Sequence, residues 1–315
     1  MQVYIVSRGV GLAQITRQDD GAAIGVWGLH TLRSAFQPIF AFEEGRLVAA
    51  AYEGLLRPFR DGAPVGAGAF FSSIPAADRN QVETLARALH FLNAQCLDET
   101  ALLFVNFDPS HFDGAGAVDG ALEDIRLVLD EAEIQPSRIM CEITEQKLHT
   151  ESELLRFVRH LREFGYQVAV DDYGAEDSDM RRILDLKPDV VKFDGLWVNQ
   201  LMETEPGRSL LFEMVRRFRG MGIRTVFEGI EEGWQLEFAE TAGVNMVQGF
   251  VLARPELAPA RFELFRRDRP DGQAAATSAS SMVVGPMPAG SPAETRAVPP
   301  PRQRRQKYAF GKRVH

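Results

Sequence analysis

The sequence predicts an α/β fold, a TIM-like β/α barrel, on three observations. Short apolar runs of strand length recur along most of the chain. Amphipathic stretches with helix periodicity separate most of these runs, so consecutive strands are joined by helices and run parallel with right-handed crossovers. The 315 residues, 45% of them hydrophobic, are enough to bury one large core. A doubly wound open sheet is the alternative that this pattern leaves open.

Seven apolar runs are the predicted strands, and helical stripes lie between most of them. In chain order the runs occupy residues 47–52, 102–105, 139–143, 168–170, 190–193, 223–227 and 244–247. In residues 82–92 apolar side chains recur at spacings of three and four, and 154–164 has a similar stripe. These two segments are therefore predicted to be helices that pack on the sheet.

The composition divides the chain into three parts. Residues 1–24 are predicted to be an N-terminal extension, 25–267 the barrel, and 268–315 a disordered tail rich in Pro, Ala, Gly and Ser. The last twenty residues contain seven Lys and Arg and no acidic residue. This basic end is interpreted either as a solubilising tail or as a contact for an acidic partner surface, lipid or RNA.

Charge and hydropathy exclude several classes of protein. A net charge of −9 argues against specific DNA binding, which depends on an excess of Lys and Arg. No apolar run approaches the roughly 18 residues that span a bilayer, and the start lacks the layout of a signal peptide, so a cytoplasmic location is expected. Cys96 and Cys141 are the only cysteines, which disfavours a zinc site or a disulfide framework.

Polar residues stand at or near the ends of the apolar runs. They are Glu53, Asn106, Glu142, Asp171, Asp172, Lys192, Glu228 and Gln248. Each one alone is interpreted as a solvated strand-end residue, but the C-terminal ends of parallel barrel strands meet at one rim. We therefore predict that these side chains form a single site.

The carboxylates of this set predict a metal site. Crowded carboxylates repel one another unless cations neutralise them. Carboxylate and amide oxygens without His or Cys suit Mg²⁺ or Mn²⁺ rather than zinc. Adjacent Asp171 and Asp172 would let one carboxylate bridge two ions while the other holds the second, as in two-metal phosphoester hydrolysis.

Eight short motifs in order resemble the signature of EAL domains over about residues 25–262. They are Phe36-Gln37-Pro38-Ile39, Tyr52-Glu53-Gly54-Leu55-Leu56-Arg57, Val105-Asn106, Glu142-Ile143-Thr144-Glu145, Asp171-Asp172-Tyr173-Gly174, Lys192-Phe193-Asp194, Glu228-Gly229-Ile230-Glu231 and Gln248-Gly249-Phe250. Gly54 stands where the family usually has Ala.

The resemblance implies a phosphodiesterase that hydrolyses cyclic-di-GMP to linear pGpG with two Mg²⁺ or Mn²⁺ ions. It implies that Glu53, Asn106, Glu142 and Asp171 hold one ion, and that Asp171 and Asp172 reach the second. Lys192, Glu228 and Asp172 are the implied catalytic residues, with Lys192 positioning the attacking water or stabilising developing charge, and Glu228 acting as a base or from outside the metal ligands. The implied substrate contacts are Gln37, Arg57, Asp194, Glu231 and Gln248.

Some of these residues have a plainer interpretation on the sequence alone. Lys192 is otherwise an exposed strand residue, although its apolar neighbours indicate a buried strand. Arg57 is otherwise part of a surface salt bridge, and Gln37 and Gln248 are otherwise strand-end amides.

The loop after Gly174 departs from the resemblance. Residues 175–180 carry three acids where the family has a Thr-Gly-Tyr-Ser-Ser-like loop, which orders the second metal site and supports a homodimer, with Glu145 as its anchor. Two hypotheses follow: an active phosphodiesterase, or a catalytically weak or silent domain that acts as a cyclic-di-GMP receptor or a protein-interaction module.

Overall fold

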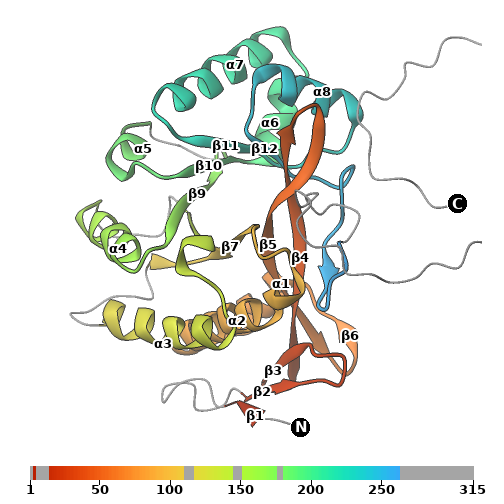
Figure 1. The fold of residues 1–315 in the computed structure, drawn as a ribbon, viewed down its shortest axis with the longest axis vertical. Coiled ribbons are helices and arrows are strands. Elements are labelled where there is room, and N and C mark those ends of the chain that lie inside the picture. The colour runs from red at the N-terminus through yellow and green to blue at the C-terminus, as the bar shows by residue number, and fades with distance from the viewer. Residues whose placement is uncertain (1–2, 5–13, 110–116, 145–150, 176–179, 263–315) are drawn as a thin grey trace, which may run out of the picture.

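The chain folds into a closed β/α barrel in the computed structural model, which describes residues 3–4, 14–109, 117–144, 151–175 and 180–262 (Figure 1). The predicted tail at 268–315 with its basic end, the loop residues 176–179 and Glu145 lie outside the described residues.

Eight strands close the barrel in the order β4, β12, β11, β10, β9, β8, β7 and β5, and β5 pairs with β4. Their bounds are β4 His30–Glu43, β5 Arg46–Arg60, β7 Leu102–Asn106, β8 Ile139–Thr144, β9 Gln167–Tyr173, β10 Val190–Phe193, β11 Arg224–Phe227 and β12 Met246–Val247. The seven strands other than β4 overlap the seven predicted runs, and each pairs in parallel with its neighbour in chain order. The barrel is thereby confirmed over the open sheet.

The strand β4 was missed, and it runs antiparallel to both of its barrel neighbours. The expectation of parallel units throughout is therefore wrong for this strand. Glu44 and Gly45 join β4 to β5, and both have positive φ, 49° and 74°. Two consecutive left-handed residues make the turn whose twist matches a tight hairpin.

Helices cover the outside of the barrel (Figure 1). They are α1 Ala67–Ser73, α2 Arg79–Asn93, α3 Ala117–Glu131, α4 Glu151–Glu163, α5 Met180–Leu186, α6 Gly195–Met202, α7 Glu205–Gly220 and α8 Gly233–Ala242, with short 3-10 turns at Ala76–Asp78, Ala94–Cys96 and Pro136–Arg138. The helices predicted at 82–92 and 154–164 correspond to α2 and α4. In the part of the chain that the structure describes, no helix is both long and apolar enough to cross a membrane.

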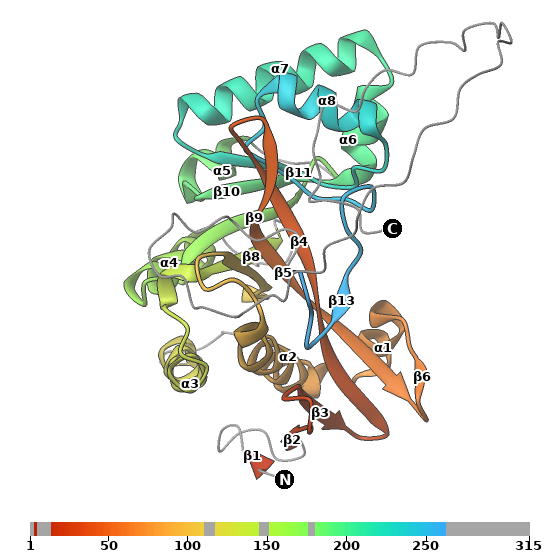
Figure 2. The ribbon, with the colours of Figure 1, turned by 45° about the vertical axis from the view of Figure 1, so that its right-hand side comes forward.

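The β4–β5 hairpin is a ribbon that extends past the C-terminal ends of the other barrel strands (Figure 2). Small strands flank it: β3 Ala23–Trp27 and β13 Glu256–Leu257 pair with β4, and β6 Ala63–Pro64 pairs with β5. Farther out, β2 Gln14–Arg17 pairs with β3, and β1 Val3–Tyr4 with β2. The boundary predicted between residues 24 and 25 falls inside β3.

The barrel interior is filled by an apolar plug to which each of the eight strands contributes one residue. These residues are Ile39, Ala51, Phe104, Met140, Ala169, Val190, Val226 and Met246, none more than 3% exposed. A larger apolar core lies between the strands and the surrounding helices. Because side chains alternate along a strand, the next inward layer lies two residues farther toward the mouth.

Candidate active site

A ring of polar residues forms the layer directly above the apolar plug. On seven strands each member follows the plug residue of its strand by two positions. On the antiparallel β4 it precedes the plug residue by two positions. The ring consists of Gln37, Glu53, Asn106, Glu142, Asp171, Lys192, Glu228 and Gln248. The structure thus brings the predicted strand-end residues to one mouth of the barrel.

Lys192 lies at the centre of this ring and is only 1% exposed. Its Nζ is 2.5 Å from Glu142 Oε1, 2.7 Å from Glu228 Oε1 and 3.0 Å from Asp171 Oδ1. Glu53 Oε2 is farther away, at 3.9 Å. One buried ammonium therefore faces four carboxylates, and the interpretation of Lys192 as an exposed strand residue is wrong.

Two glutamines complete the β4 and β12 side of the site. Gln248, 4% exposed, donates from Nε2 to Glu53 Oε2 at 2.7 Å. Gln37 faces Glu53 across the β4–β5 pair and donates from Nε2 to the Ala253 carbonyl at 3.3 Å. Both amides are therefore held in place beside the carboxylate.

A bulge turns the adjacent Asp171 and Asp172 toward the same site. In a regular strand they would point to opposite faces. Between the pairs Val170–Val191 and Tyr173–Phe193, β9 has one residue more than β10, and Asp172 has a φ of 56°. An extra residue of this kind re-aims side chains. As a result one oxygen each from Asp171, Asp172 and Glu228 lie within 4.8 Å of one another.

Burial makes full ionisation of this cluster costly. It raises the pKa of Glu142 well above its usual range and that of Glu228 to about 8, in each case against the opposing effect of Lys192. Burial and the neighbouring charge of Asp171 also raise the pKa of Asp172. For Lys192 burial alone would lower the pKa, but the surrounding carboxylates outweigh it and raise the pKa well above normal. A single ammonium does not neutralise this set.

The donor atoms suit hard divalent cations. Both carboxylate oxygens of Glu142 and Oδ1 of Asp171 are buried without a hydrogen bond, although two of these three oxygens form ion pairs with Lys192. The ring offers carboxylate and amide oxygens, the ligands that Mg²⁺, Mn²⁺ and Ca²⁺ prefer. The residues present therefore fit a divalent-metal centre.

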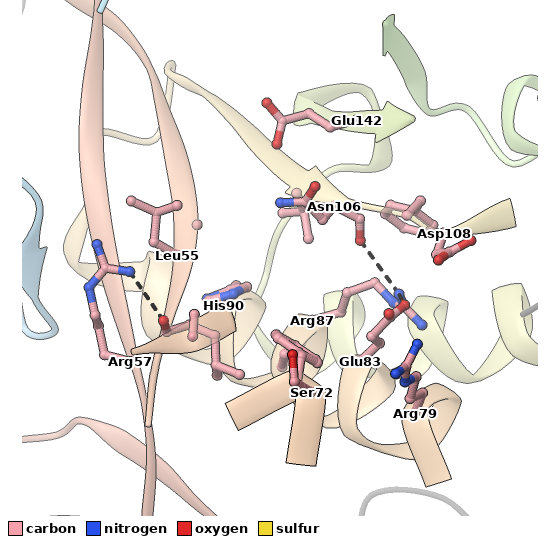
Figure 3. Close-up of a pocket in the computed structure, with 17 residues that line it drawn as sticks. Leu55, Arg57, Ser72, Arg79, Glu83, Arg87, His90, Asn106, Asp108 and Glu142 are labelled. Carbon is pink, nitrogen blue, oxygen red and sulfur yellow. Dashed lines mark hydrogen bonds and ion pairs between the residues drawn. The ribbon is translucent and has the colours of Figure 1, made fainter. Parts of the chain in front are cut away.

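Two cavities adjoin the ring. One of about 300 Å³ is lined by seven of the predicted residues, Gln37, Glu53, Asp171, Asp172, Lys192, Glu228 and Gln248, and by the predicted substrate contact Glu231. The other, about 470 Å³, lies between β5, α1 and α2, with Asn106 and Glu142 in its wall (Figure 3). Arg57 lines the second cavity and donates to the Leu56 carbonyl at 3.1 Å. Asp194 caps α6 by accepting from Trp197 N at 2.8 Å.

Sequence reasoning missed residues that hold the site from outside. Arg87 on α2, 3% exposed, lies 5.0 Å from the Phe107 ring and points at the Asn106 carbonyl at 3.5 Å (Figure 3). Asn199 on α6 donates to the Gly229 carbonyl at 2.9 Å and accepts from Gln235 Nε2 at 3.0 Å. These contacts fix the segments that carry Asn106 and Glu228. Of these residues only Gln235 could have been singled out from the sequence, because it forms a capping box with Glu232 at the start of α8.

Gly54 has a packing reason to lack a methyl group. A Cβ at this position would lie 2.9 Å from Cγ of His90, a buried residue whose Nδ1 is 3.0 Å from Ser34 Oγ. Burial lowers the pKa of His90 to about 3, so the ring is neutral at physiological pH. A neutral, hydrogen-bonded imidazole thus occupies the space that an alanine would need.

We expect Gly54→Ala to lower the free energy of unfolding by about 1–3 kcal/mol, because overpacking forces the buried ring to shift. Urea denaturation would measure the loss. Gly68→Ala in α1 is the matched control, since a Cβ there meets nothing within 4 Å. If the two variants were equally stable, His90 would move aside at no cost and close packing would not explain the glycine.

The fold and the acid-lined mouth define a class, the β/α barrels with a polar site at the C-terminal ends of their strands. A family model described as EAL domain matches residues 28–255. The chain therefore belongs to the EAL domain family, which includes the cyclic-di-GMP phosphodiesterases.

Relatives in sequence are longer than this chain. YkuI of Bacillus subtilis, an uncharacterized EAL-domain containing protein, is 31% identical over 231 residues, which are 70% of this chain and 54% of YkuI. RocR of Pseudomonas aeruginosa, a cyclic di-GMP phosphodiesterase, is 35% identical over 136 residues, 42% of this chain and 34% of RocR. The chain thus spans about half or less of the length of these relatives.

Solved structures share the fold. The YkuI crystal structure, in complex with c-di-GMP and calcium, superposes with a TM-score of 0.63 at 25% identity, covering 71% of this chain and 56% of YkuI. Klebsiella pneumoniae BlrP1, in a complex with manganese and c-di-GMP, has a TM-score of 0.64 at 23% identity, covering 78% of this chain and 59% of BlrP1. Both were solved with a divalent metal and the cyclic dinucleotide.

Proposed function

We propose that this chain is a divalent-metal-dependent phosphodiesterase that hydrolyses cyclic-di-GMP to linear pGpG. The observation that carries the proposal is the ring of oxygen donors around Lys192, in which one ammonium faces four carboxylates. Membership of the EAL family supports the reaction class, and the complexes of YkuI and BlrP1 support the ligand and the use of a divalent metal.

Two Mg²⁺ or Mn²⁺ ions are the proposed cofactors. Glu53, Asn106, Glu142 and Asp171 would hold one, and Asp171 with Asp172 would reach the other. Such ions, when bound, supply Lewis-acid stabilisation of the phosphodiester and acidify an attacking water. The location of Glu228 beside Asp171 and Asp172 places its carboxylate within reach of the same region.

The chain's own residues would handle the proton and the developing charge. The Glu228 carboxylate, 2.7 Å from Lys192 Nζ, would accept a proton from the attacking water. Lys192 would orient that water and stabilise negative charge on the phosphorus oxygens, because a buried ammonium acts strongly in a water-poor site. Asp172, the exposed residue of the β9 bulge, completes the proposed catalytic set.

Substrate would lie across the mouth, between the two cavities. Gln37, Glu231 and Gln248 line the smaller cavity and Arg57 the larger one, and these side chains would contact phosphate or base. Asp194 would contact the substrate at the N-terminus of α6, which it caps. The larger cavity, about 470 Å³, has room for a nucleobase.

We expect the purified chain to convert cyclic-di-GMP to pGpG with Mn²⁺ or Mg²⁺, and a chelator to abolish the conversion until excess metal is added back. Chromatography of the products would follow the reaction. Turnover that survives chelation would contradict the metal mechanism. Tight binding of the nucleotide without turnover, with both metals and over a range of protein concentrations, would reassign the chain to the receptor class.

A further inference from the structure

The β4–β5 ribbon has one buried and one partly open face beyond the barrel mouth. On β5, Gly54, Leu56 and Pro58 are buried, with Gly54 against His90 of α2, whereas the alternating residues Leu55, Arg57 and Phe59 are partly exposed. Glu53 belongs to the same alternating set. The open face is therefore continuous with the polar ring and leads outward from it.

Two arginines stand opposite each other on this open face. Arg33 of β4 is the register partner of Arg57 of β5, two cross-strand steps beyond the Gln37–Glu53 pair. The two pairs are four residues apart along each strand, which corresponds to about 13 Å along the backbone. Like charges directly opposite each other in a sheet are destabilising, and among the described residues no carboxylate lies within ion-pair distance of either guanidinium. An anionic ligand between them would relieve this repulsion.

The two guanidinium groups are held in place and still have donors to offer. Arg33 donates from one terminal nitrogen to the Ala258 carbonyl at 3.3 Å, and its guanidinium carbon lies 6.0 Å from the Phe59 ring centre. Arg57 donates from one terminal nitrogen to the Leu56 carbonyl. Because a guanidinium carries five N–H donors, one such bond leaves several for a ligand. Paired arginines of this kind suit the oxygens of a phosphate.

We propose that Arg33 is a specificity-determining residue that forms, with Arg57, a clamp for the second phosphodiester of a cyclic dinucleotide. The inference rests on the proposed function, in which the first phosphodiester lies at the metal centre. The Arg33–Arg57 pair lies four strand residues outward from the Gln37–Glu53 pair, so the substrate would extend from the metal centre along the open face of the ribbon. Substrates with a single phosphodiester gain nothing from the clamp.

The test compares Arg33→Met, which keeps most of the side-chain packing and removes the charge, with Arg60→Met. Arg60 lies on the same ribbon three residues from Arg57, so its side chain points to the opposite face of the strand. Its Nε is 3.9 Å from Asp61 Oδ2. With Mn²⁺ and cyclic-di-GMP, Arg33→Met should raise KM about tenfold, the factor expected for loss of one charged contact, with little change in kcat. Hydrolysis of bis(4-nitrophenyl) phosphate, a single diester, should be unchanged. Arg60→Met should behave as the unmodified chain with both substrates.

Arg33→Lys keeps the charge without the planar fork and should recover part of the lost affinity. Equal losses on both substrates, or an unchanged KM for cyclic-di-GMP in a variant that melts normally, would overturn the clamp while leaving the phosphodiesterase intact. If the unmodified chain shows no turnover, calorimetric titration with cyclic-di-GMP and Ca²⁺ still tests the clamp, because it measures the Kd directly. A tenfold weaker Kd for Arg33→Met would support the clamp, and an equal Kd would remove it.

Discussion

Lys192→Met should lower the free energy of unfolding of the metal-free protein by about 3–5 kcal/mol, the cost of removing one partner from a buried ion pair. The ammonium is 1% exposed and contacts Glu142, Asp171 and Glu228, so its loss leaves three neighbouring carboxylates without their cation. Urea denaturation in the presence of a chelator would measure the change.

Added Mn²⁺ should reduce this cost, because divalent cations neutralise the same carboxylates, but it should not restore turnover. Arg216→Met is the control: Arg216 pairs with Glu213 on the exposed surface of α7, where an ion pair contributes little. A Lys192→Met protein as stable as that control without metal would show that the carboxylates are protonated or dispersed, and that Lys192 does not organise the site.

The barrel and the ring were predictable from the sequence for a single physical reason. Each barrel strand carries a plug residue that must be apolar and, two positions farther, a ring residue that is free to be polar. An apolar run with one polar residue at or next to its end, such as 190–193 with its Lys192, marks both the strand and its place in the site. Parallel strands then bring these ends together without further information.

The antiparallel β4 was not predicted because nothing local separates a parallel from an antiparallel neighbour. Its turn, Glu44-Gly45, carries the glycine typical of a tight hairpin, but the first residue is not one that favours a left-handed backbone. The ribbon that β4 forms with β5 is nevertheless the element that brings Arg33 opposite Arg57. When the pairing of two strands brings a residue to a site, the sequence around that residue carries no pattern that reveals it.

The bulge at Asp171 and Asp172 is a second feature beyond the reach of the sequence. Adjacent acids on a strand would face opposite sides, and only the extra residue relative to β10 turns both toward the mouth. Arg87 and Asn199 act through backbone carbonyls, so their roles depend on tertiary contacts that a helix pattern does not record. The pairing of Gly54 with His90 was hidden for the same reason.

Glu53→Gln should reduce turnover of cyclic-di-GMP at least ~100-fold, since even residues that merely support metal ligands cost 10–100-fold when changed. The substitution keeps the shape of the side chain and removes its charge. The new amide oxygen would still accept the hydrogen bond that Gln248 donates to Glu53 at 2.7 Å, so the fold should be preserved. Product chromatography with Mn²⁺ would measure the loss.

Thermal melting separates a lost metal ligand from general damage, because the two predict opposite changes. Removing one carboxylate from a crowded cluster relieves repulsion, so Glu53→Gln should melt at the same temperature as the unmodified chain, or higher, when a chelator is present. The upward shift of Tm on adding Mn²⁺ should shrink, since that shift reports metal affinity. Glu256→Gln, an exposed change on β13, should alter neither quantity. Near-normal turnover with an unchanged Mn²⁺ shift would show that Glu53 binds no metal.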